Sequence, residues 1–395
     1  MTGGRRLERL DLPDEVVEIA SRLERAGFET WCVGGAIRDA LLGQGQADVD
    51  LATSATPEDV QRIFRRTVAV GLKFGTVGVL DRNRQLHEVT TFRRDVATDG
   101  RHAVVEYGVS LDDDLARRDL TINAIAYHPL DYRWRDPFHG IDDLEAGVVR
   151  AVGDPVQRFR EDFLRILRAM RFATRLGFTI HPATWEAAQA EVEGLRRLSA
   201  ERVRDEWFRS LESARSLRRL VRLWHESGAA RVLLPELLPP FPLAVDAPDE
   251  RDPLLLTAAL CEDPCTVVRR LKCSNAEVAR VERYTRPDPA PGGADVRSVR
   301  RWLASVGVAA DDLLAVYRLR TGRPAAWAAT VAEIRARGEP LGRGDLAVTG
   351  TDLQAAGVPP GPAVGRVLGE LLDQVLDDPS LNRREVLLDR ARGLA

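Results

Sequence analysis

The stretch Val33–Thr53 reads VGGAIRDALLGQGQADVDLAT. It begins with a glycine pair, Gly34 and Gly35, and ends with a D-V-D triplet in which one residue separates Asp48 from Asp50. Alternate side chains of a strand lie on the same face, so we predict that the two aspartates project together. Two adjacent carboxylates repel each other, and a divalent cation relieves that repulsion. Mg²⁺ suits such a site because it takes oxygen ligands and shares them with substrate phosphates.

The residues just before the aspartates favour a phosphate ligand. Gly34 and Gly35 allow the backbone to approach a triphosphate more closely than a residue with a side chain could. Arg38 follows the pair by three residues and is in reach of the same phosphates. A lone D-x-D motif also occurs on exposed strands and turns without any function. Together with the glycines and the arginine, it predicts a metal and nucleotide-phosphate site for phosphoryl transfer.

Length and composition limit the possible classes of protein. At 395 residues the chain exceeds one ordinary core and predicts two to four domains. The net charge is −3, so a nucleic-acid-binding surface has to be a local patch. No apolar run approaches membrane-spanning length and the N-terminal segment has no apolar signal core, so we expect a cytoplasmic protein without a membrane partner. Four cysteines fit no zinc pattern and are expected to be reduced thiols: Cys32, Cys261, Cys265 and Cys273.

A third carboxylate and a loop follow the aspartate pair. The strand predicted at Leu86–Phe92 alternates, so Glu88 and Thr90 share one face. Glu88 is a candidate third acidic residue of the site, and a solvent-facing strand position is an equally good interpretation. Residues Arg93–Val104 are polar and contain a glycine, which predicts a mobile loop beside the site.

The next segment places two arginines near the predicted phosphates. Helices are predicted at Leu111–Leu115 and Leu120–Ala126, with Arg117 and Arg118 in the turn between them. The two arginines are placed to contact a triphosphate. A solvated basic pair is the alternative interpretation.

The remaining chain has a helical pattern, and its first part carries a charged stripe. We expect residues 156–178, VQRFREDFLRILRAMRFATRLGF, to form one long helix on which Asp162, Arg165, Arg168 and Arg171 recur at three-residue spacing. Such a stripe is normally a solvated face with salt bridges. Close to a nucleotide site, an aspartate beside an arginine also offers acceptors and donors to a base edge, and the later arginines could reach phosphates.

These motifs together resemble a known family. The set GGAIRD, DVD, EVTTFRRD, RRDLTINAIAY, DPFHGIDDL and REDFLRILRAMRFA resembles the class II tRNA nucleotidyltransferases, the CCA-adding enzymes. Bacterial poly(A) polymerases share their superfamily. The resemblance is strong over Val33–Phe178, and residues 346–368 are similar to the C-terminal tail of the family with less specificity.

The resemblance implies an α+β fold. The head would be a nucleotidyltransferase domain similar to that of DNA polymerase β, followed by an all-helical neck, body and tail. The corresponding ranges are 1–150, 151–230, 231–338 and 339–395.

The resemblance also implies roles for individual residues. Asp48 and Asp50 match the metal-binding carboxylates, and Glu88 matches a third acidic position of the catalytic site. Asp162 and Arg165 match a protein template that pairs with the base of CTP or ATP. The positions that match nucleotide-binding residues are Gly34, Gly35, Arg38, Arg118, Asp162, Arg165, Arg168 and Arg171.

The implied reaction is two-metal nucleotidyl transfer with Mg²⁺ to a tRNA held by its acceptor arm. Three functions stay open: a CCA-adding enzyme, including forms restricted to CC or to A; a poly(A) polymerase; and an idle RNA-binding protein. In the family that the chain resembles, enzymes restricted to adding CC are shortened in the loop that corresponds to Arg94–Ala116. Here this segment keeps its centre, Thr98–His102, and shows no deletion, so the resemblance disfavours a CC-only enzyme. The sequence leaves the oligomeric state open.

Overall fold

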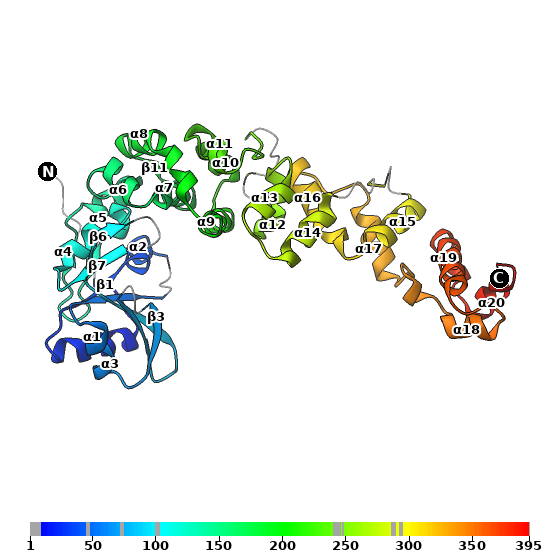
Figure 1. The fold of residues 1–395 in the computed structure, drawn as a ribbon, viewed down its shortest axis with the longest axis horizontal. Coiled ribbons are helices and arrows are strands. Elements are labelled where there is room, and N and C mark those ends of the chain that lie inside the picture. Colours follow the sequence, from blue (N-terminus) through cyan, green and yellow to red (C-terminus); the bar gives the residue numbers. More distant parts are fainter. Residues whose placement is uncertain are drawn as a thin grey trace. The chain divides into compact units, whose positions relative to one another are not determined.

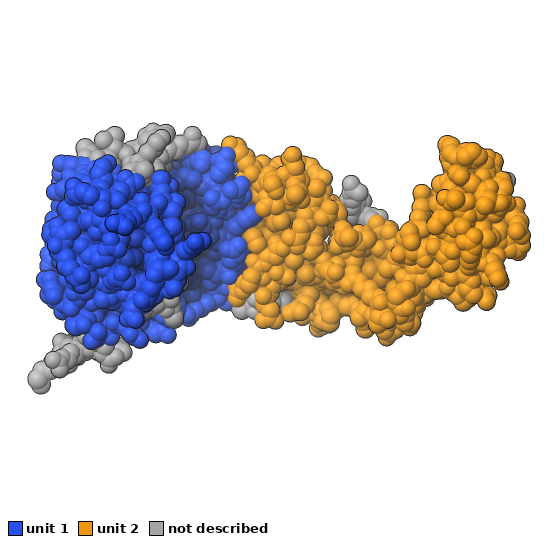
Figure 2. All heavy atoms as spheres, turned by 90° about the horizontal axis from the view of Figure 1, so that it is seen from below, with its two compact units in different colours: residues 1–239 blue, residues 240–395 orange. Residues whose placement is uncertain are grey.

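The chain divides into two compact units, Met1–Pro239 and Pro240–Ala395, which Figure 2 colours separately. In the part that this computed structural model describes, no helix is long and apolar enough to cross a membrane. The described residues are 9–44, 48–71, 75–98, 103–239, 246, 249–285, 290–291 and 295–394.

A mixed sheet forms the centre of the first unit (Figure 1). Its strand order is β3-β4-β5-β2-β1-β8-β9, and two smaller sheets pair β6 with β7 and β10 with β11. In the main sheet β2 is antiparallel to β1 and parallel to β5. The strands are β1 (Thr30–Val33), β2 (Asp50–Thr53), β3 (Thr67–Gly71), β4 (Thr76–Leu80), β5 (Leu86–Thr91), β6 (Arg93–Thr98), β7 (Ala103–Tyr107), β8 (Ala126–Tyr127), β9 (Trp134–Arg135), β10 (Val148–Val149) and β11 (Thr179–Ile180).

Two helices of this unit begin with a side-chain cap. The side chain of Thr56 caps α3 by accepting a hydrogen bond from the Asp59 N–H, and Ser110 caps α4 in the same way. The helices are α1 (Asp14–Arg25), α2 (Gly35–Leu41), α3 (Pro57–Ile63), α4 (Leu111–Ala116), α5 (Gly140–Ala146), α6 (Pro155–Glu161), α7 (Leu164–Leu176), α8 (Pro182–Ala190), α9 (Ala200–Ser213), α10 (Leu217–Glu226) and α11 (Ala229–Leu233).

The two faces of the main sheet are covered unequally. On one face Leu51 and Val89 pack into a core that also contains Leu23 of α1 and Phe172 of α7. On the other face a second core lies over β1, β2 and β8, where α4 packs. The β3–β4–β5 part of this second face carries exposed side chains, Leu86 among them. The sheet is therefore closed on one side and half open on the other.

The single long helix predicted at residues 156–178 is wrong. The structure has two helices, α6 and α7, separated at Asp162, whose backbone is extended (φ −155°, ψ 105°). The Asp162 Oδ1 accepts a hydrogen bond from the Leu164 N–H at 3.1 Å. Aspartate makes such local bonds to the backbone outside helices, and these compete with helix continuation. Periodicity alone does not reveal this break.

Three further predictions of secondary structure are also wrong. The segment predicted as a loop at Arg93–Val104 is largely a β-hairpin, β6–β7, because its two arms pair in antiparallel register. Residues 99–102, within the predicted loop centre, lie outside the described residues. The helix predicted at Leu120–Ala126 is a short 3₁₀ turn, Thr121–Asn123, followed by β8, which pairs with β1. After residue 153 the chain also contains β11, which is held by pairing with β10.

The described part of the second unit is helical. Trp302 and Trp327 belong to one apolar cluster, and Leu371 and Leu387 belong to another. Buried Arg300 joins α15 to the end of α19 through a hydrogen bond from Nη1 to the Leu376 carbonyl at 2.6 Å. The helices are α12 (Pro253–Leu260), α13 (Pro264–Arg270), α14 (Asn275–Thr285), α15 (Val296–Val306), α16 (Ala310–Thr321), α17 (Ala328–Ala336), α18 (Gly350–Ala355), α19 (Pro362–Asp377) and α20 (Arg384–Arg392).

Candidate active site

One pocket of the first unit, with a cavity volume of about 490 Å³, brings most of the predicted site residues together. They come from the start of α2, from β2, from the turn after α4, from the break before α7 and from α7 itself. The predicted residues that line it are Gly34, Gly35, Arg38, Asp50, Arg118, Asp162, Arg165 and Arg168. Residues more than 100 positions apart in sequence thus share one cavity.

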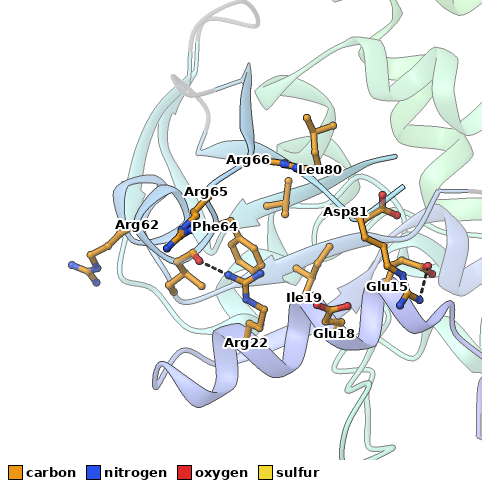
Figure 3. Close-up of a pocket in the computed structure, with 13 residues that line it drawn as sticks. Glu15, Glu18, Ile19, Arg22, Arg62, Phe64, Arg65, Arg66, Leu80 and Asp81 are labelled. Atoms are coloured by element: carbon orange, nitrogen blue, oxygen red, sulfur yellow. Dashed lines mark hydrogen bonds and ion pairs between the residues drawn. The ribbon is translucent and has the colours of Figure 1, made fainter. Parts of the chain in front are cut away.

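A second pocket of about 360 Å³ lies between α1, the end of α3, and β4 (Figure 3). Several of its charged side chains are already paired: the Arg22 guanidinium donates to the Ile63 carbonyl, and that of Arg82 donates to Glu15. Neither the glycine pair nor Asp50 lines this pocket. We therefore take the first pocket as the candidate active site.

Asp50 is the central carboxylate of the site. It is the first residue of β2 and lies opposite Val33, which directly precedes the glycine pair. Burial raises its pKa to about 6, and the neighbouring Glu88 and Asp48 carboxylates act in the same direction. The Arg118 guanidinium opposes this shift. Asp50 is therefore a partly desolvated carboxylate that a cation would stabilise.

Asp48 and Glu88, the other two predicted acidic residues, are more exposed than Asp50. Asp48 precedes β2 and is exposed, so only Asp50 of the predicted pair belongs to the strand. Glu88 is exposed on β5. Among the described residues, no group of three His, Cys, Asp or Glu side chains is arranged to hold a metal ion.

The oxygen donors of Asp48 and Asp50 fit a divalent cation that shares its ligands with a substrate. Mg²⁺ is usually bound in proteins by one or two carboxylates together with substrate phosphates and waters. Burial is the main cause of the raised pKa of Asp50, and repulsion from Glu88 and Asp48 adds to it; a bound cation would relieve that repulsion.

Gly34 keeps a space open between the guanidinium of Arg118 and the carboxylate of Asp50. Its φ of +83° lies in the left-handed region that favours glycine. A Cβ at this position would lie 3.3 Å from Arg118 Nη1 and 3.5 Å from Asp50 Oδ2. A side chain here would enter the place where a phosphate could meet both groups.

Arg118 is fixed by an acidic residue that the sequence analysis missed. Asp114, on α4, is fully buried and accepts hydrogen bonds from Arg117 Nη2 at 2.8 Å and from Arg118 Nη2 at 3.3 Å. Burial alone would raise the pKa of Asp114, but the two arginines outweigh it and hold that pKa below its usual value. The helical spacing of three and four residues between Asp114 and the arginines would have indicated this role.

We expect Asp114→Asn to increase the KM for a nucleoside triphosphate about tenfold with a smaller effect on kcat, because an amide cannot balance two cations, and a charged hydrogen bond contributes about 1.5–3 kcal/mol. Steady-state kinetics and thermal melting measure the two effects. Asp112→Asn is the matched control, since Asp112 lies on the same helix but pairs at the surface with Arg135. An unchanged KM for the nucleoside triphosphate in a folded Asp114→Asn variant would contradict this positioning role.

A second buried network holds Arg38 and Arg168. Arg38 Nη1 donates to Asn123 Oδ1 at 2.5 Å, and Asn123 Nδ2 donates to Asp119 Oδ1 at 3.0 Å. Arg168 Nε donates to Asp119 Oδ2 at 2.7 Å. Although burial raises the pKa of Asp119, Arg168 and Asn123 lower it to about 2. Asp119 and Asn123, which the sequence analysis missed, therefore link the two arginines across the pocket.

Asp162 and Arg165 both line the pocket, and each is held by protein partners. Asp162 Oδ2 accepts a hydrogen bond from Arg202 Nη2 of α9 at 2.7 Å. Arg165 donates from Nη1 to Glu161 Oε2 at 2.6 Å and from Nη2 to the Arg117 carbonyl at 3.0 Å. The two predicted base-reading side chains therefore have fixed positions, Asp162 at the break between α6 and α7 and Arg165 in the first turn of α7.

Arg171 is not among the residues that line the pocket. It is buried, and its Nε donates to Glu206 Oε1 of α9 at 2.5 Å. Each step of three residues on a helix falls about 60° short of a full turn, so the stripe has rotated by about 120° between Arg165 and Arg171. In this structure Arg171 attaches α7 to α9.

Family models match three parts of the chain. A family model described as the poly A polymerase head domain matches residues 30–150. A model of an RNA and SrmB binding site of polymerase A matches residues 177–239, and a model of tRNA nucleotidyltransferase domain 2 matches residues 254–391.

Two relatives that match over most of the chain are CCA-adding enzymes. The chain is 34% identical to a CCA-adding enzyme of Levilactobacillus brevis over 94% of this chain and 95% of that protein. It is 36% identical to one of Lacticaseibacillus paracasei over 96% and 97%. A crystal structure of the Bacillus stearothermophilus CCA-adding enzyme in complex with CTP is similar with a TM-score of 0.79 and 31% identity, covering 96% of this chain and 98% of that one.

Proposed function

Because this chain belongs to the family of CCA-adding enzymes, we propose that it adds C, C and A to the 3′ end of tRNA from CTP and ATP. The observation that carries the proposal is the pocket that Asp50, Gly34 and Arg118 share with Asp162 and Arg165. The first three residues suit a triphosphate, and the last two suit the edge of a base. Together they could select a nucleotide without a nucleic-acid template.

The charged groups near Asp50 would perform the transfer step. Asp48 and Asp50 would hold Mg²⁺, which lowers the pKa of the attacking 3′-hydroxyl and offsets the charge of the triphosphate. Arg118 lies beside Gly34, is half-buried and is oriented by Asp114, so it can stabilise negative charge as it develops. The buried carboxylate of Asp119 balances the charge of Arg168, which also lines the pocket.

Asp162 and Arg165 would select the base by offering one acceptor and several donors. Arg171 would act indirectly, because it holds α7 against α9.

We retain the division into head (1–150), neck (151–230), body (231–338) and tail (339–395) as part of the proposal. The tail would bind the tRNA acceptor arm through its shape and backbone. We place the reaction in the cytoplasm, where the four free cysteines stay reduced.

We expect the protein to add all three nucleotides. A tRNA transcript that ends before CCA should receive C, C and A when CTP and ATP are both supplied, and only C and C with CTP alone. The physical reason is that Asp162 and Arg165 would select the incoming base in the same pocket at each step. Transcripts ending before CCA, after C and after CC, resolved on a sequencing gel, test each step.

The same experiment separates the alternatives. Extension of the CC-ended transcript alone would make this an A-adding enzyme, and a stop after CC in the presence of ATP would make it a CC-adding enzyme. Long A tails on unrelated RNA would instead support a poly(A) polymerase. The Asp50→Asn protein is the negative control for all transcripts.

A further inference from the structure

The half-open face of the main sheet carries side chains that the proposed reaction does not use. Gly78 of β4 lies opposite Val68 of β3 on one side and opposite Glu88 of β5 on the other. Directly opposed residues share a face of the sheet. Leu51 pairs with Val89 on the closed face, so Asp50 and Glu88 both lie on the half-open face. The surface around Gly78 is therefore continuous with the candidate active site.

This surface is apolar and exposed. Val68 and Val70 are each 44% exposed, and Leu86 is 39% exposed. A Cβ on Gly78 would lie 2.5 Å from Leu86 Cδ1 and 2.7 Å from Val70 Cγ2. The absence of a side chain at Gly78 thus allows Val70 and Leu86 to meet above β4. We refer to Val68, Val70 and Leu86 around Gly78 as the apolar platform.

The platform lies on the opposite side of Asp50 from the nucleotide pocket. Gly34 and Gly35 follow β1, which adjoins β2 on one side, whereas β5, β4 and β3 follow in order on the other. Neighbouring strands are about 4.8 Å apart, so β4 lies about 10 Å from β2. In phosphoryl transfer the attacking and leaving oxygens are roughly in line. With the triphosphate on the β1 side, the attacking 3′-hydroxyl has to approach from the side of β5.

We propose that the apolar platform binds the base of the 3′-terminal nucleotide of tRNA during each addition; this inference rests on the proposed function. A nucleobase face is flat and weakly polar, and covering Val70 and Leu86 with it removes apolar surface from water. Exposed apolar patches of this kind commonly mark binding surfaces. The continuity of the platform with Asp50 identifies the substrate strand, rather than a partner protein, as the occupant.

The chemistry of the platform suits a terminal base that changes from step to step. Valine and leucine side chains contain no hydrogen-bonding group, so they contact any base without reading its edge. On the same face the hydroxyls of Thr76 and Thr90 bond to each other at 3.0 Å. Base selection would thus reside in the nucleotide pocket, while the platform would position whichever base was added last.

The test combines a variant with a modified substrate. The double variant Val70→Ser/Leu86→Ser is compared with the wild type on a tRNA ending before CCA and on the same tRNA whose terminal ribose carries no base. For the wild type, removal of the base should lower kcat/KM for tRNA about tenfold, which corresponds to about 1.4 kcal/mol. On the normal tRNA, the kcat/KM of the variant should be about tenfold below that of the wild type. Removal of the terminal base should lower the kcat/KM of the variant no further.

Several controls separate this role from a structural one. The affinity for CTP without tRNA and the melting temperature should be unchanged in the double variant. Gly78→Ala, whose Cβ would push Val70 and Leu86 apart, should reproduce the loss without adding a polar group. Val308→Ser removes a valine that is 83% exposed in the second unit and is the matched control.

The possible outcomes are distinct. If the variant still loses tenfold when the terminal base is removed, the platform does not bind that base and the proposal is overturned. Wild-type kinetics in both the double variant and Gly78→Ala would overturn it as well. If the wild type adds no nucleotide to any tRNA, the proposed function itself fails, and the inference falls with it.

Discussion

Asp50→Asn should reduce nucleotide transfer by about a thousandfold or more, because the amide removes the charge that holds the cation beside the triphosphate. A catalytic metal ion contributes several kcal/mol to transition-state stabilisation, and each 1.36 kcal/mol corresponds to a factor of ten in rate. Single-turnover incorporation of CMP into a tRNA ending before CCA measures the loss. The fold should remain intact, since the backbone pairing of β2 with β1 and β5 does not depend on the charge of the Asp50 side chain.

The same variant should be more stable than the wild type when metal is absent. The pKa of Asp50 is raised from 3.8 to about 6, so the folded protein binds this proton more tightly than the unfolded chain does. The free energy of unfolding therefore falls as the pH rises from about 4 to about 6, and it stays lower above that range. At pH 8 the metal-free variant should gain on the order of 2 kcal/mol, and this difference should shrink as the pH falls towards 4.

Thermal melting in EDTA and in Mg²⁺, across this pH range, provides the measurement. Mg²⁺ with CTP should raise the melting temperature of the wild type and should have little effect on Asp50→Asn. Asp112→Asn, which changes an exposed carboxylate of the same domain, should melt and react like the wild type. Near-normal transfer by Asp50→Asn would show that Asp50 is not a metal ligand. If the metal-free variant is less stable than the wild type at pH 8, the Asp50 carboxylate is not destabilised by burial.

Arg165→Ala should impair the choice of nucleotide more than the rate of transfer. The arginine lines the pocket beside Asp162, and a lost pairing partner in a desolvated site costs about 1–3 kcal/mol. Discrimination of CTP against UTP should therefore fall by about tenfold to a hundredfold, while the rate with saturating CTP falls less. Single-nucleotide incorporation assays with each of the four nucleotides measure both quantities.

The structural contacts of Arg165 require a control, since it also bonds to Glu161 and to the Arg117 carbonyl. Arg165→Lys keeps the charge but loses the planar guanidinium, so it should retain the fold and still lose discrimination. Arg160→Ala removes an exposed arginine of α6 that pairs with Glu191 and should have no effect. If Arg165→Ala excludes UTP and GTP as strongly as the wild type does, Arg165 has a structural role only.

Some features of the fold follow from nearby residues in the sequence. The Thr56 cap, the left-handed glycine Gly34 and the amphipathic face of α1 depend on interactions within a few residues. Such local preferences are present before the rest of the chain packs. For the same reason the elements that carry Asp50 and Arg118 could be predicted, and short motifs led to the family.

Other features depend on partners that are distant in sequence. Arg165 and Arg171 have the same spacing pattern, and only the packing of α7 on α9 shows that one lines the pocket and the other bonds to Glu206. The break at Asp162 coincides with its contact to Arg202, forty residues later. Periodicity carries no information on such contacts, because it describes the face of a helix and not what that face meets.

The sequence by itself determined the chemical groups of this protein: a carboxylate pair, a glycine turn, and arginines for phosphates and a base. Tertiary structure decided how those groups behave. Burial beside Glu88 raises the pKa of Asp50, and buried Asp114 orients Arg118. The arrangement of the strands leaves one face open beyond Asp50. These properties arise from desolvation and from charges brought together across the fold, and both depend on three-dimensional distance rather than on position along the chain.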